Sequence, residues 1–351
     1  MRSEPSAALR HRTVEAPAGR LHLVEQGTGP LVLLVHGFPE SWYSWRRQLP
    51  ALATAGYRAV AIDVRGYGRS SKPAETGAYR MLDLVEDNVA LVHALREENA
   101  VVVGHDWGSN IAATSALLHP EIFRAVALLS VPYTPPGGPR PTGIFGQIGG
   151  PEQEFYVSYF QEPGRAETEI EPDVRGWLAG FYTALSADTM PAGDGPDPHF
   201  VAHGGRLRDR FPAGPLPAWL SEDDLDIYAG EFERTGLTGA LNRYRNMDRD
   251  WEDLAPHHGA PIVHRPVLDD TLMRPSNLGL TEGMDLHPRP TTLPVQAVEP
   301  VGALSSPVQP VSVRAAARAS PHTAARRRWT WTAEGNTVRT GKENSTIGTG
   351  G

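Results

Sequence analysis

The stretch VVVGHDWGSNIAA, residues 101–113, determines how the rest of the chain can be interpreted. A run of apolar residues leads into a turn bracketed by Gly104 and Gly108, and a segment of helix-like composition follows. A buried strand, a tight turn and a helix in this order form an elbow that holds its central residue in a strained, exposed position. That central residue is Asp106.

The identity of Asp106 limits the chemistry of the elbow. A carboxylate that attacks a saturated carbon is left as an alkyl ester, which suits the opening of a strained ring or the displacement of a halide. Alternatively, Asp106 only caps the following helix, because aspartate is a favoured residue at that position. The two glycines favour the nucleophile, since a simple cap requires neither of them.

Composition and charge set broad limits on the whole chain. Its 351 residues are enough for about two domains, and it contains no cysteine, which excludes disulfides and thiolate sites. A formal net charge of -8, without a basic stripe before the C-terminal region, argues against nucleic acid as the main partner. Residues 1–19 are polar, so we expect a flexible N-terminus rather than a secretory signal. Without an apolar run of about 20 residues, we expect no membrane partner and a cytoplasmic protein.

Buried strand segments alternate with helical segments through the first half of the chain. The strand pattern covers residues 20–25, 31–35, 59–62, 100–103 and 125–131, and the helix pattern covers 45–55, 79–96 and 111–118. This order predicts an α/β fold with a doubly wound, mostly parallel sheet over residues 20–132. Ligands of such sheets bind beyond the carboxyl ends of the strands, where Asp106 stands.

The composition changes after Pro132, where a linker rich in proline and glycine begins. Helical patterns then continue to about residue 251, and Ser221 with Asp224 resembles a capping box whose helix Gly236 can end. We therefore expect a helical lid over residues 133–250 and a return to the core over residues 251–262.

Three motifs in the first half of the chain resemble the epoxide hydrolase branch of the α/β-hydrolase superfamily. They are HGFPESW at residues 36–42, DVRGYGRS at 63–70 and GHDWGS at 104–109. The resemblance covers about residues 20–262 and implies an α/β-hydrolase fold with an inserted lid. It also implies hydrolysis of an epoxide to a vicinal diol through an alkyl-enzyme ester on Asp106, with no metal or cofactor. The implied partners are a small apolar epoxide and water.

The resemblance assigns further site residues. The backbone N–H groups of Phe38 and Trp107 map onto the oxyanion hole, and Tyr156 and Tyr244 map onto the pair that binds the epoxide oxygen. A phenol with a pKa near 10 can donate such a hydrogen bond while it is uncharged. The alternative is that both tyrosines are lid aromatics whose hydroxyls face water. We expect Tyr159 to be a packing residue.

Two further expectations concern the loops that follow the early strands. We expect His36 to be structural, beneath its loop, rather than the catalytic base, and the resemblance implies a cis bond before Pro39. The glycine spacing of residues 63–70 is not that of a phosphate-binding loop, so its arginine and aspartate are expected to form structural salt bridges.

The resemblance ends at Ile262. In the family, two more strands follow, one leading to an acid and the other to a Gly-His-Trp-like segment that supplies the base. Residues 263–351 instead contain recurring prolines, and carry 10 Lys and Arg against 7 Asp and Glu. We expect a disordered tail, in which the acid and the histidine of the charge relay are unknown and turnover is doubtful. We hypothesise that a reading-frame change replaced the native C-terminus.

Two other functions remain open at this point. A haloalkane dehalogenase shares the aspartate elbow followed by tryptophan, but it would bind a halide with indole or amide N–H groups, so the two lid tyrosines favour the epoxide. An inactive pseudo-enzyme that binds apolar ligands in the lid cavity is the alternative without chemistry.

Overall fold

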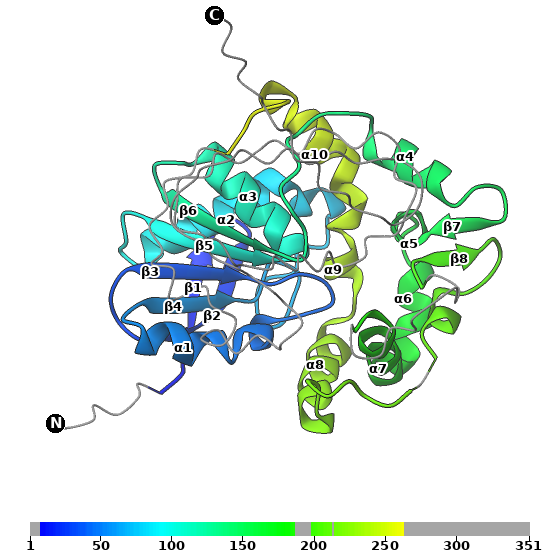
Figure 1. The fold of residues 1–351 in the computed structure, drawn as a ribbon, viewed down its shortest axis with the longest axis horizontal. Coiled ribbons are helices and arrows are strands. Elements are labelled where there is room, and N and C mark those ends of the chain that lie inside the picture. The colour runs from blue at the N-terminus through cyan, green and yellow to red at the C-terminus, as the bar shows by residue number, and fades with distance from the viewer. Residues whose placement is uncertain (1–7, 187–197, 213, 263–351) are drawn as a thin grey trace, which may run out of the picture. The chain divides into compact units, whose positions relative to one another are not determined.

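The computed structural model describes residues 8–186, 198–212 and 214–262 (Figure 1). Within these ranges, six strands form one sheet in the order β1-β2-β4-β3-β5-β6. Neighbours among β4, β3, β5 and β6 are parallel, whereas β2 pairs antiparallel with both β1 and β4. The predicted doubly wound, mostly parallel sheet is therefore confirmed. The strands are β1 (Arg10–Ala16), β2 (Gly19–Gln26), β3 (Leu31–Val35), β4 (Arg58–Ile62), β5 (Ala100–His105) and β6 (Phe123–Leu129).

The sheet is buried on both faces, which explains why its central strands are continuous apolar runs. Along β3, Leu31, Leu33 and Val35 join one hydrophobic cluster, whereas Val32 and Leu34 join the other. The first cluster includes residues of α2 and α3, and the second includes residues of α1. These helices are α1 (Gln48–Thr54), α2 (Met81–Ala94) and α3 (Trp107–Leu118). Each buried aliphatic side chain contributes roughly 1.5–3 kcal/mol.

Several element boundaries in the core differ from the prediction; the strand expected at residues 125–131, for example, is β6 at Phe123–Leu129. Part of the N-terminus that we expected to be flexible is strand β1, which pairs with β2 along its whole length. Val14 is its only buried residue, so the sequence shows no alternation of apolar residues there. The first predicted helix is also shorter, because a 3₁₀ helix, η1 (Trp42–Trp45), occupies its start. A second 3₁₀ helix, η2 (Thr76–Tyr79), precedes α2.

The segment after β6, residues 130–262, is called the insertion below. Its described part is mainly helical, as predicted (Figure 1). It also contains a small antiparallel sheet that we did not predict, because strands of three residues are too short to show a pattern. The capping box at Ser221 and Asp224 is formed and begins α8, which ends at Gly236. The elements are α4 (Pro141–Ile148), β7 (Gln153–Phe155), α5 (Tyr156–Tyr159), α6 (Arg165–Ile170), η3 (Glu171–Asp173), α7 (Val174–Leu185), β8 (Phe200–Ala202), η4 (Leu207–Arg210), α8 (Glu222–Thr235), α9 (Thr238–Leu241), η5 (Tyr244–Asn246), α10 (Met247–Asp253) and η6 (Ala255–His257).

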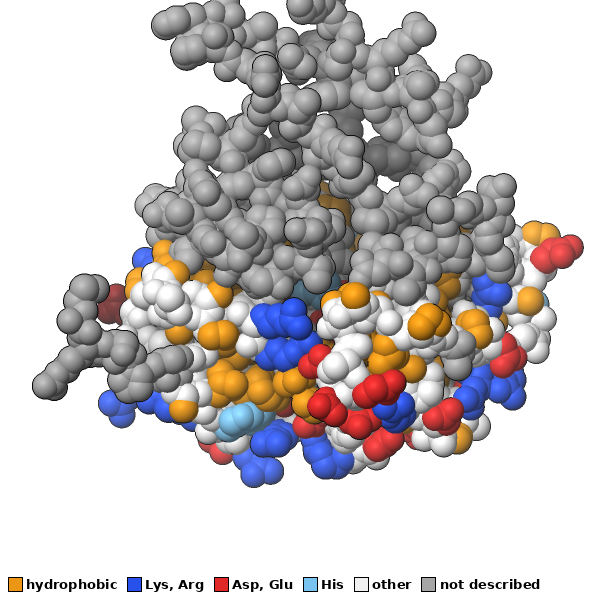
Figure 2. Space-filling model, turned by 60° about the horizontal axis from the view of Figure 1, so that its bottom comes forward, with side chains coloured by type: hydrophobic (Ala, Val, Ile, Leu, Met, Phe, Trp, Pro, Cys, Tyr) orange, Lys and Arg blue, Asp and Glu red, His pale blue; other side chains and the backbone are white. Residues whose placement is uncertain are grey.

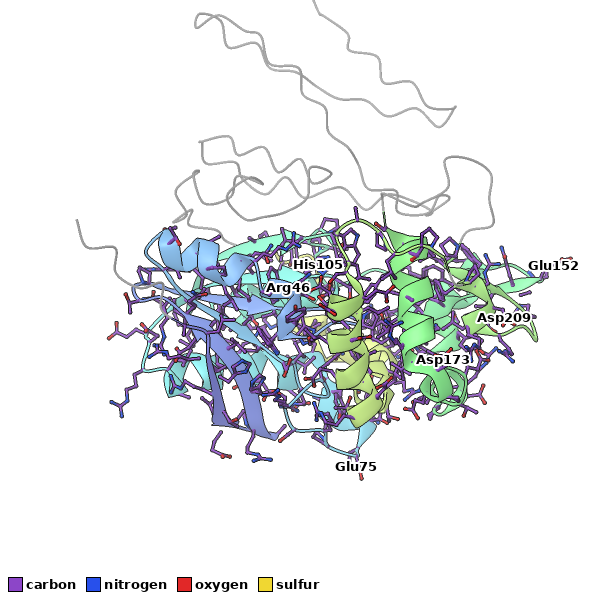
Figure 3. The ribbon with its side chains drawn as sticks, turned by 90° about the horizontal axis from the view of Figure 1, so that it is seen from below. Arg46, Glu75, His105, Glu152, Asp173 and Asp209 are labelled. Carbon is purple, nitrogen blue, oxygen red and sulfur yellow. The ribbon has the colours of Figure 1, made fainter. Side chains whose placement is uncertain are left out.

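Helix α8 is attached to the core by polar contacts. Asp224 accepts a hydrogen bond of 2.9 Å from the Tyr43 hydroxyl and forms an ion pair with Arg46. The hydroxyls of Ser44 and Tyr228 are 2.9 Å apart. Figure 3 shows Arg46 at this junction, whereas Glu152 and Asp209 lie at the outer end of the insertion. In the space-filling view, basic and acidic side chains are interspersed over the described part of the face drawn (Figure 2).

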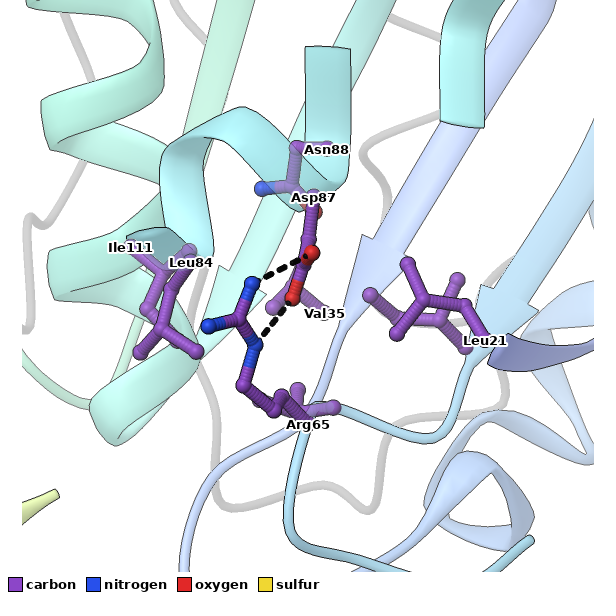
Figure 4. A pocket seen from close by; sticks show the side chains of 9 residues that line it. Leu21, Val35, Arg65, Leu84, Asp87, Asn88 and Ile111 are labelled. Atoms are coloured by element: carbon purple, nitrogen blue, oxygen red, sulfur yellow. Dashed lines mark hydrogen bonds and ion pairs between the residues drawn. The ribbon is translucent and has the colours of Figure 1, made fainter. Parts of the chain in front are cut away.

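The turn at residues 63–70 is held by structural ion pairs, as predicted. Arg65 donates two hydrogen bonds of 2.7 Å to the carboxylate of Asp87 on α2. The pair lines a small cavity that is otherwise mostly apolar (Figure 4). Asp63 binds His22 at 2.8 Å and accepts hydrogen bonds from two backbone N–H groups. The charged side chains of Asp63 and Arg65 therefore both have partners within the fold.

The described chain ends at Ile262, which is buried in the core. Residues 261 and 262, where we expected a return strand to begin, have no strand assignment. The predicted disordered tail, residues 263–351, lies outside the described residues. Within the described ranges, no helix has the length and apolar character required to span a bilayer.

Candidate active site

Asp106 stands at the turn between β5 and α3 with φ 52° and ψ -123°. This backbone conformation is strained for a residue with a side chain, and such strain concentrates at functional sites. Both bracketing glycines are required by close backbone approach. A Cβ on Gly104 would lie 2.0 Å from the carbonyl oxygen of Gly108, and one on Gly108 would lie 2.1 Å from that of Val35. The predicted elbow is present.

The carboxylate of Asp106 does not cap helix α3 through its side chain. Its Oδ1 accepts a hydrogen bond of 2.8 Å from the backbone N–H of Phe38. The backbone N–H of the adjacent Trp107 also favours the charged carboxylate. The two N–H groups assigned by the resemblance thus converge on the carboxylate of Asp106, and the simple helix-cap alternative does not describe this side chain.

Burial raises the pKa of Asp106 above its ordinary value. The positive charge of His105 and the N–H groups of Phe38 and Trp107 offset part of this increase. The carboxylate is therefore poorly solvated and held mainly by directed hydrogen bonds, which suits a nucleophile.

The loop at residues 36–40 brings Phe38 to Asp106. Gly37 is necessary there, because a Cβ at this position would lie 2.4 Å from Cβ of Asp106. The bond between Phe38 and Pro39 is cis, as the resemblance implied. His36 is buried, its Nδ1 donating to Gly37 O at 2.8 Å and its Nε2 accepting from the Val64 N–H at 3.0 Å. Both ring nitrogens are occupied, so the structural interpretation of His36 is confirmed.

An ion pair beside Asp106 was not predicted from the sequence. Nδ1 of His105 lies 3.1 Å from Oε2 of Glu40, which also accepts a hydrogen bond of 2.9 Å from the Gly37 N–H. Burial disfavours both charges, but their mutual attraction outweighs it, raising the pKa of His105 to about 9 and lowering that of Glu40 to about 2. Both residues stand inside the quoted motifs, and only their separation of 65 positions concealed the pairing.

Tyr244 lies directly against the elbow. It is 2% exposed, and its ring contacts those of Trp107 and Phe38 edge-on, with centroids 5.2 and 5.4 Å apart. The indole that a halide site would use is therefore packed against a tyrosine.

Tyr156 lies at the start of α5, with its backbone N–H bound to His199 O at 2.8 Å. Its ring centroid is 6.1 Å from that of Tyr244. Burial, and then the charge of Asp106, raise the pKa of Tyr156 well above its usual range, and burial also raises that of Tyr244. Both phenols therefore stay protonated at neutral pH. Neither hydroxyl is freely solvated, as it would be if the two tyrosines were lid aromatics whose hydroxyls face water.

Tyr159 has a packing role, as predicted. It is 1% exposed, its hydroxyl donates to Glu169, and the guanidinium carbon of Arg165 lies 3.6 Å from its ring centroid. All of these partners are within the insertion, so Tyr159 is separate from the pair formed by Tyr156 and Tyr244.

Two supporting residues also escaped sequence analysis. Oγ of Ser109 lies 2.9 Å from Gly104 O and 2.8 Å from Leu129 O, which fastens the start of α3 to the ends of β5 and β6. The guanidinium carbon of Arg243 lies 4.6 Å from the ring centroid of Trp107. Arg243 directly precedes Tyr244 in the sequence, and this adjacency is the signal that could have suggested the cation–π contact with Trp107.

The surroundings of the site are strongly aromatic. Several rings of the insertion contact Phe38 or the two tyrosines: Phe155, Phe160, Trp177, Phe181 and His199. An apolar surface with a few polar groups is typical of a small-molecule site. In the part of the chain that the structure describes, no group of three or more His, Asp or Glu side chains is arranged to hold a metal ion.

Comparison with known proteins identifies similar molecules. Residues 30–209 match the family model described as alpha/beta hydrolase fold. Epoxide hydrolase B of Mycobacterium tuberculosis is 44% identical over 287 residues, and the match covers 72% of this chain and 81% of that protein. Epoxide hydrolase A of the same organism is 46% identical, with 73% and 79% covered.

Solved structures give the same result. An epoxide hydrolase from an endophytic Streptomyces is 71% identical, with a TM-score of 0.70 and coverage of 73% of this chain and 77% of that one. Epoxide Hydrolase A from Mycobacterium thermoresistibile is 42% identical, with a TM-score of 0.68 and coverage of 73% and 80%. The predicted α/β-hydrolase fold is confirmed, and the C-terminal part of the chain is unmatched.

Proposed function

This chain belongs to the epoxide hydrolases of the α/β-hydrolase fold, hydrolases that act on ether bonds, and on that premise we propose that Asp106 opens the epoxide ring as a nucleophile. One oxygen of its carboxylate attacks a ring carbon, and the bond between that carbon and the ring oxygen breaks. The electron pair goes to the ring oxygen, and an ester joins Asp106 to the substrate. The observation that carries the proposal is the carboxylate at φ 52°, with Oδ1 held by the Phe38 N–H.

Tyr156 and Tyr244 supply the proton in this proposal. The ring oxygen accepts hydrogen bonds from their hydroxyls, and one of them protonates it as the bond breaks. Support comes from the 6.1 Å separation of their ring centroids and from the influence of the Asp106 charge on the pKa of both side chains. Because the pKa of each phenol is raised, each begins the reaction as a neutral donor.

The backbone N–H groups of Phe38 and Trp107 serve the second step. Water adds to the ester carbonyl and creates an oxyanion, which these donors stabilise. When the oxyanion collapses, the bond between the carbonyl carbon and the alkyl oxygen breaks, that oxygen takes up a proton, and the vicinal diol leaves while the carboxylate of Asp106 is restored. The water must lose a proton to a base, and residues 263–351 contain no histidine or acid in a family-like context. We therefore propose that this chain forms the ester and then stalls.

Each proposed domain has one role in this reaction. We propose that residues 20–132 carry the nucleophile, that residues 133–250 are a lid over it, and that residues 251–262 return to the core. The aromatic side chains of the insertion around Phe38 favour a small apolar epoxide as substrate.

The test is the intact mass of the purified chain after incubation with styrene oxide, followed by peptide mapping. We expect a mass increase of one styrene oxide on the peptide that contains Asp106, and none in the Asp106→Ala variant. An adduct that the variant also forms would assign the reaction to another nucleophile and overturn the proposal.

Counting the product separates the two steps. We expect no more than about one diol per chain, because the ester is not hydrolysed repeatedly. Continuous release of diol would show that a residue after Val263 supplies the base. Binding of styrene oxide without adduct or diol would favour a pseudo-enzyme, and release of bromide from 1-bromobutane would favour a dehalogenase.

A further inference from the structure

The loop at residues 36–40 is contacted by helix α7 of the insertion as well as by the core. The Tyr182 hydroxyl donates a hydrogen bond of 2.5 Å to the carbonyl oxygen of Pro39. The residue before this proline is Phe38, whose N–H binds Asp106 and whose ring lies 6.2 Å from that of Trp177 and 6.3 Å from that of Phe181. Helix α7 thus touches two consecutive residues of the loop.

The position of Tyr182 is itself well determined. The side chain is 8% exposed, and its ring lies 5.8 Å from that of Trp219 and 5.5 Å from that of Tyr228. Pro39 is also buried. A buried carbonyl that loses its donor is costly, so the loop would move to satisfy that oxygen if the hydroxyl were removed.

We propose that Tyr182 is a positioning residue that holds the Phe38 N–H on the carboxylate of Asp106. It acts through the backbone of the loop and touches neither the reacting atoms nor the substrate. The hydrogen bond from Tyr182 to Pro39 thus links the packing of the insertion against the core to the position of the Phe38 N–H beside Asp106. Small displacements of such groups have large effects on rate. The expected effect on the rate of adduct formation rests on the proposed function, whereas the expected effect on the order of the loop does not.

Burial raises the pKa of the Tyr182 phenol well above its usual range, so the hydroxyl remains a donor throughout the accessible pH range. The Gly37, Phe38 and Glu40 N–H groups all form hydrogen bonds in this loop or to Asp106. These amides report directly on the order of the loop, because an intact hydrogen bond slows their exchange with solvent.

The experiment compares Tyr182→Phe with Tyr228→Phe in the full chain. Both variants keep the ring and remove one hydroxyl that joins the insertion to the core, but the hydroxyl of Tyr228 contacts Ser44 rather than the loop. Amide hydrogen exchange of the peptide spanning residues 36–42 is measured by mass spectrometry. The rate of adduct formation with styrene oxide is measured on the same samples, after urea denaturation has shown that both variants are folded.

We expect Tyr182→Phe to accelerate amide exchange in this peptide about tenfold and to slow adduct formation about tenfold, with little change in the affinity for styrene oxide. Tyr228→Phe should change neither rate more than about twofold, since it leaves the loop contact intact. Unchanged exchange in Tyr182→Phe, or equal acceleration in both variants, would overturn the proposal. If the unsubstituted chain forms no adduct, the proposed function fails, and the exchange comparison still decides the role of Tyr182.

Discussion

At the scale of single residues, the site concentrates strain and charge in a few side chains. Asp106 combines a positive φ with a half-buried carboxylate, each of which costs free energy that the rest of the fold must offset. The compensation is local. Two backbone N–H groups and the neighbouring His105 favour the charged form of this carboxylate.

The pair of His105 and Glu40 leads to a pH-dependent contribution to stability. Since the pKa of His105 is raised from 6.5 to about 9, its contribution is complete below pH 6.5 and is lost as the pH rises through 9. Since the pKa of Glu40 is lowered from 4.5 to about 2, its contribution is complete above pH 4.5 and is lost as the pH falls towards 2. The pair therefore stabilises the fold most between pH 4.5 and 6.5.

We expect His105→Asn to lower the free energy of unfolding by about 1–2 kcal/mol at pH 6, allowing for solvent screening at a partly exposed site. The difference from the unsubstituted chain should shrink towards zero at about pH 10. Urea denaturation of both chains across this range measures it. His119→Asn, whose contacts to Glu86 and Glu121 are 3.4 Å long and solvent-exposed, is the matched control with little expected effect. A pH-independent difference for His105→Asn would contradict the assignment.

At the scale of elements, the elbow depends on how closely β5, α3 and the end of β3 approach one another. We expect Gly108→Ala to destabilise the chain by about 3 kcal/mol or more, because the new Cβ would meet backbone atoms at 2.1 and 2.7 Å. Gly230→Ala, inside α8 with nothing within 4 Å of its Cβ position, should stabilise it by about 0.5–1 kcal/mol through helix propensity. Chemical denaturation of both variants checks the opposite signs; equal effects would refute the packing argument.

Elements with a local signal could be predicted from the sequence. Strand β3 is a continuous apolar run because both of its faces are buried, and α8 follows its capping box. Strand β1 has one buried residue and depends on its pairing with β2, so no local pattern reveals it. In the site, motifs located Asp106 and Phe38. The contact between Tyr182 and Pro39 joins residues 143 positions apart, which no local pattern encodes.

At the scale of the whole molecule, one buried carboxylate joins the core to the insertion. Asp250 accepts a hydrogen bond of 2.6 Å from the Met81 N–H at the start of α2, and it forms an ion pair with Arg243. Arg243 in turn stacks on Trp107, the residue after Asp106. The order of the site thus depends on a contact between two parts of the chain that are distant in sequence.

We expect Asp250→Ala to lower the free energy of unfolding by about 3 kcal/mol or more, because it leaves a buried guanidinium without its partner. Asp253→Ala removes a carboxylate paired with the more exposed Arg80 and should cost less than about 1 kcal/mol. Urea denaturation monitored by tryptophan fluorescence measures both. Similar losses in the two variants would show that the Asp250 contact has no special weight.

The order of elements along the chain has a consequence for biosynthesis. In the described part of the chain, the strands of the large sheet, the glycine-bracketed turn and the loop at residues 36–40 come from residues 10–129. The insertion begins only afterwards. Because a nascent chain leaves the ribosome from its N-terminus, the turn that presents Asp106 can be complete before the helices that pack against it have been translated. The ribosome therefore synthesises the sheet and the turn at Asp106 before the helices that pack against them.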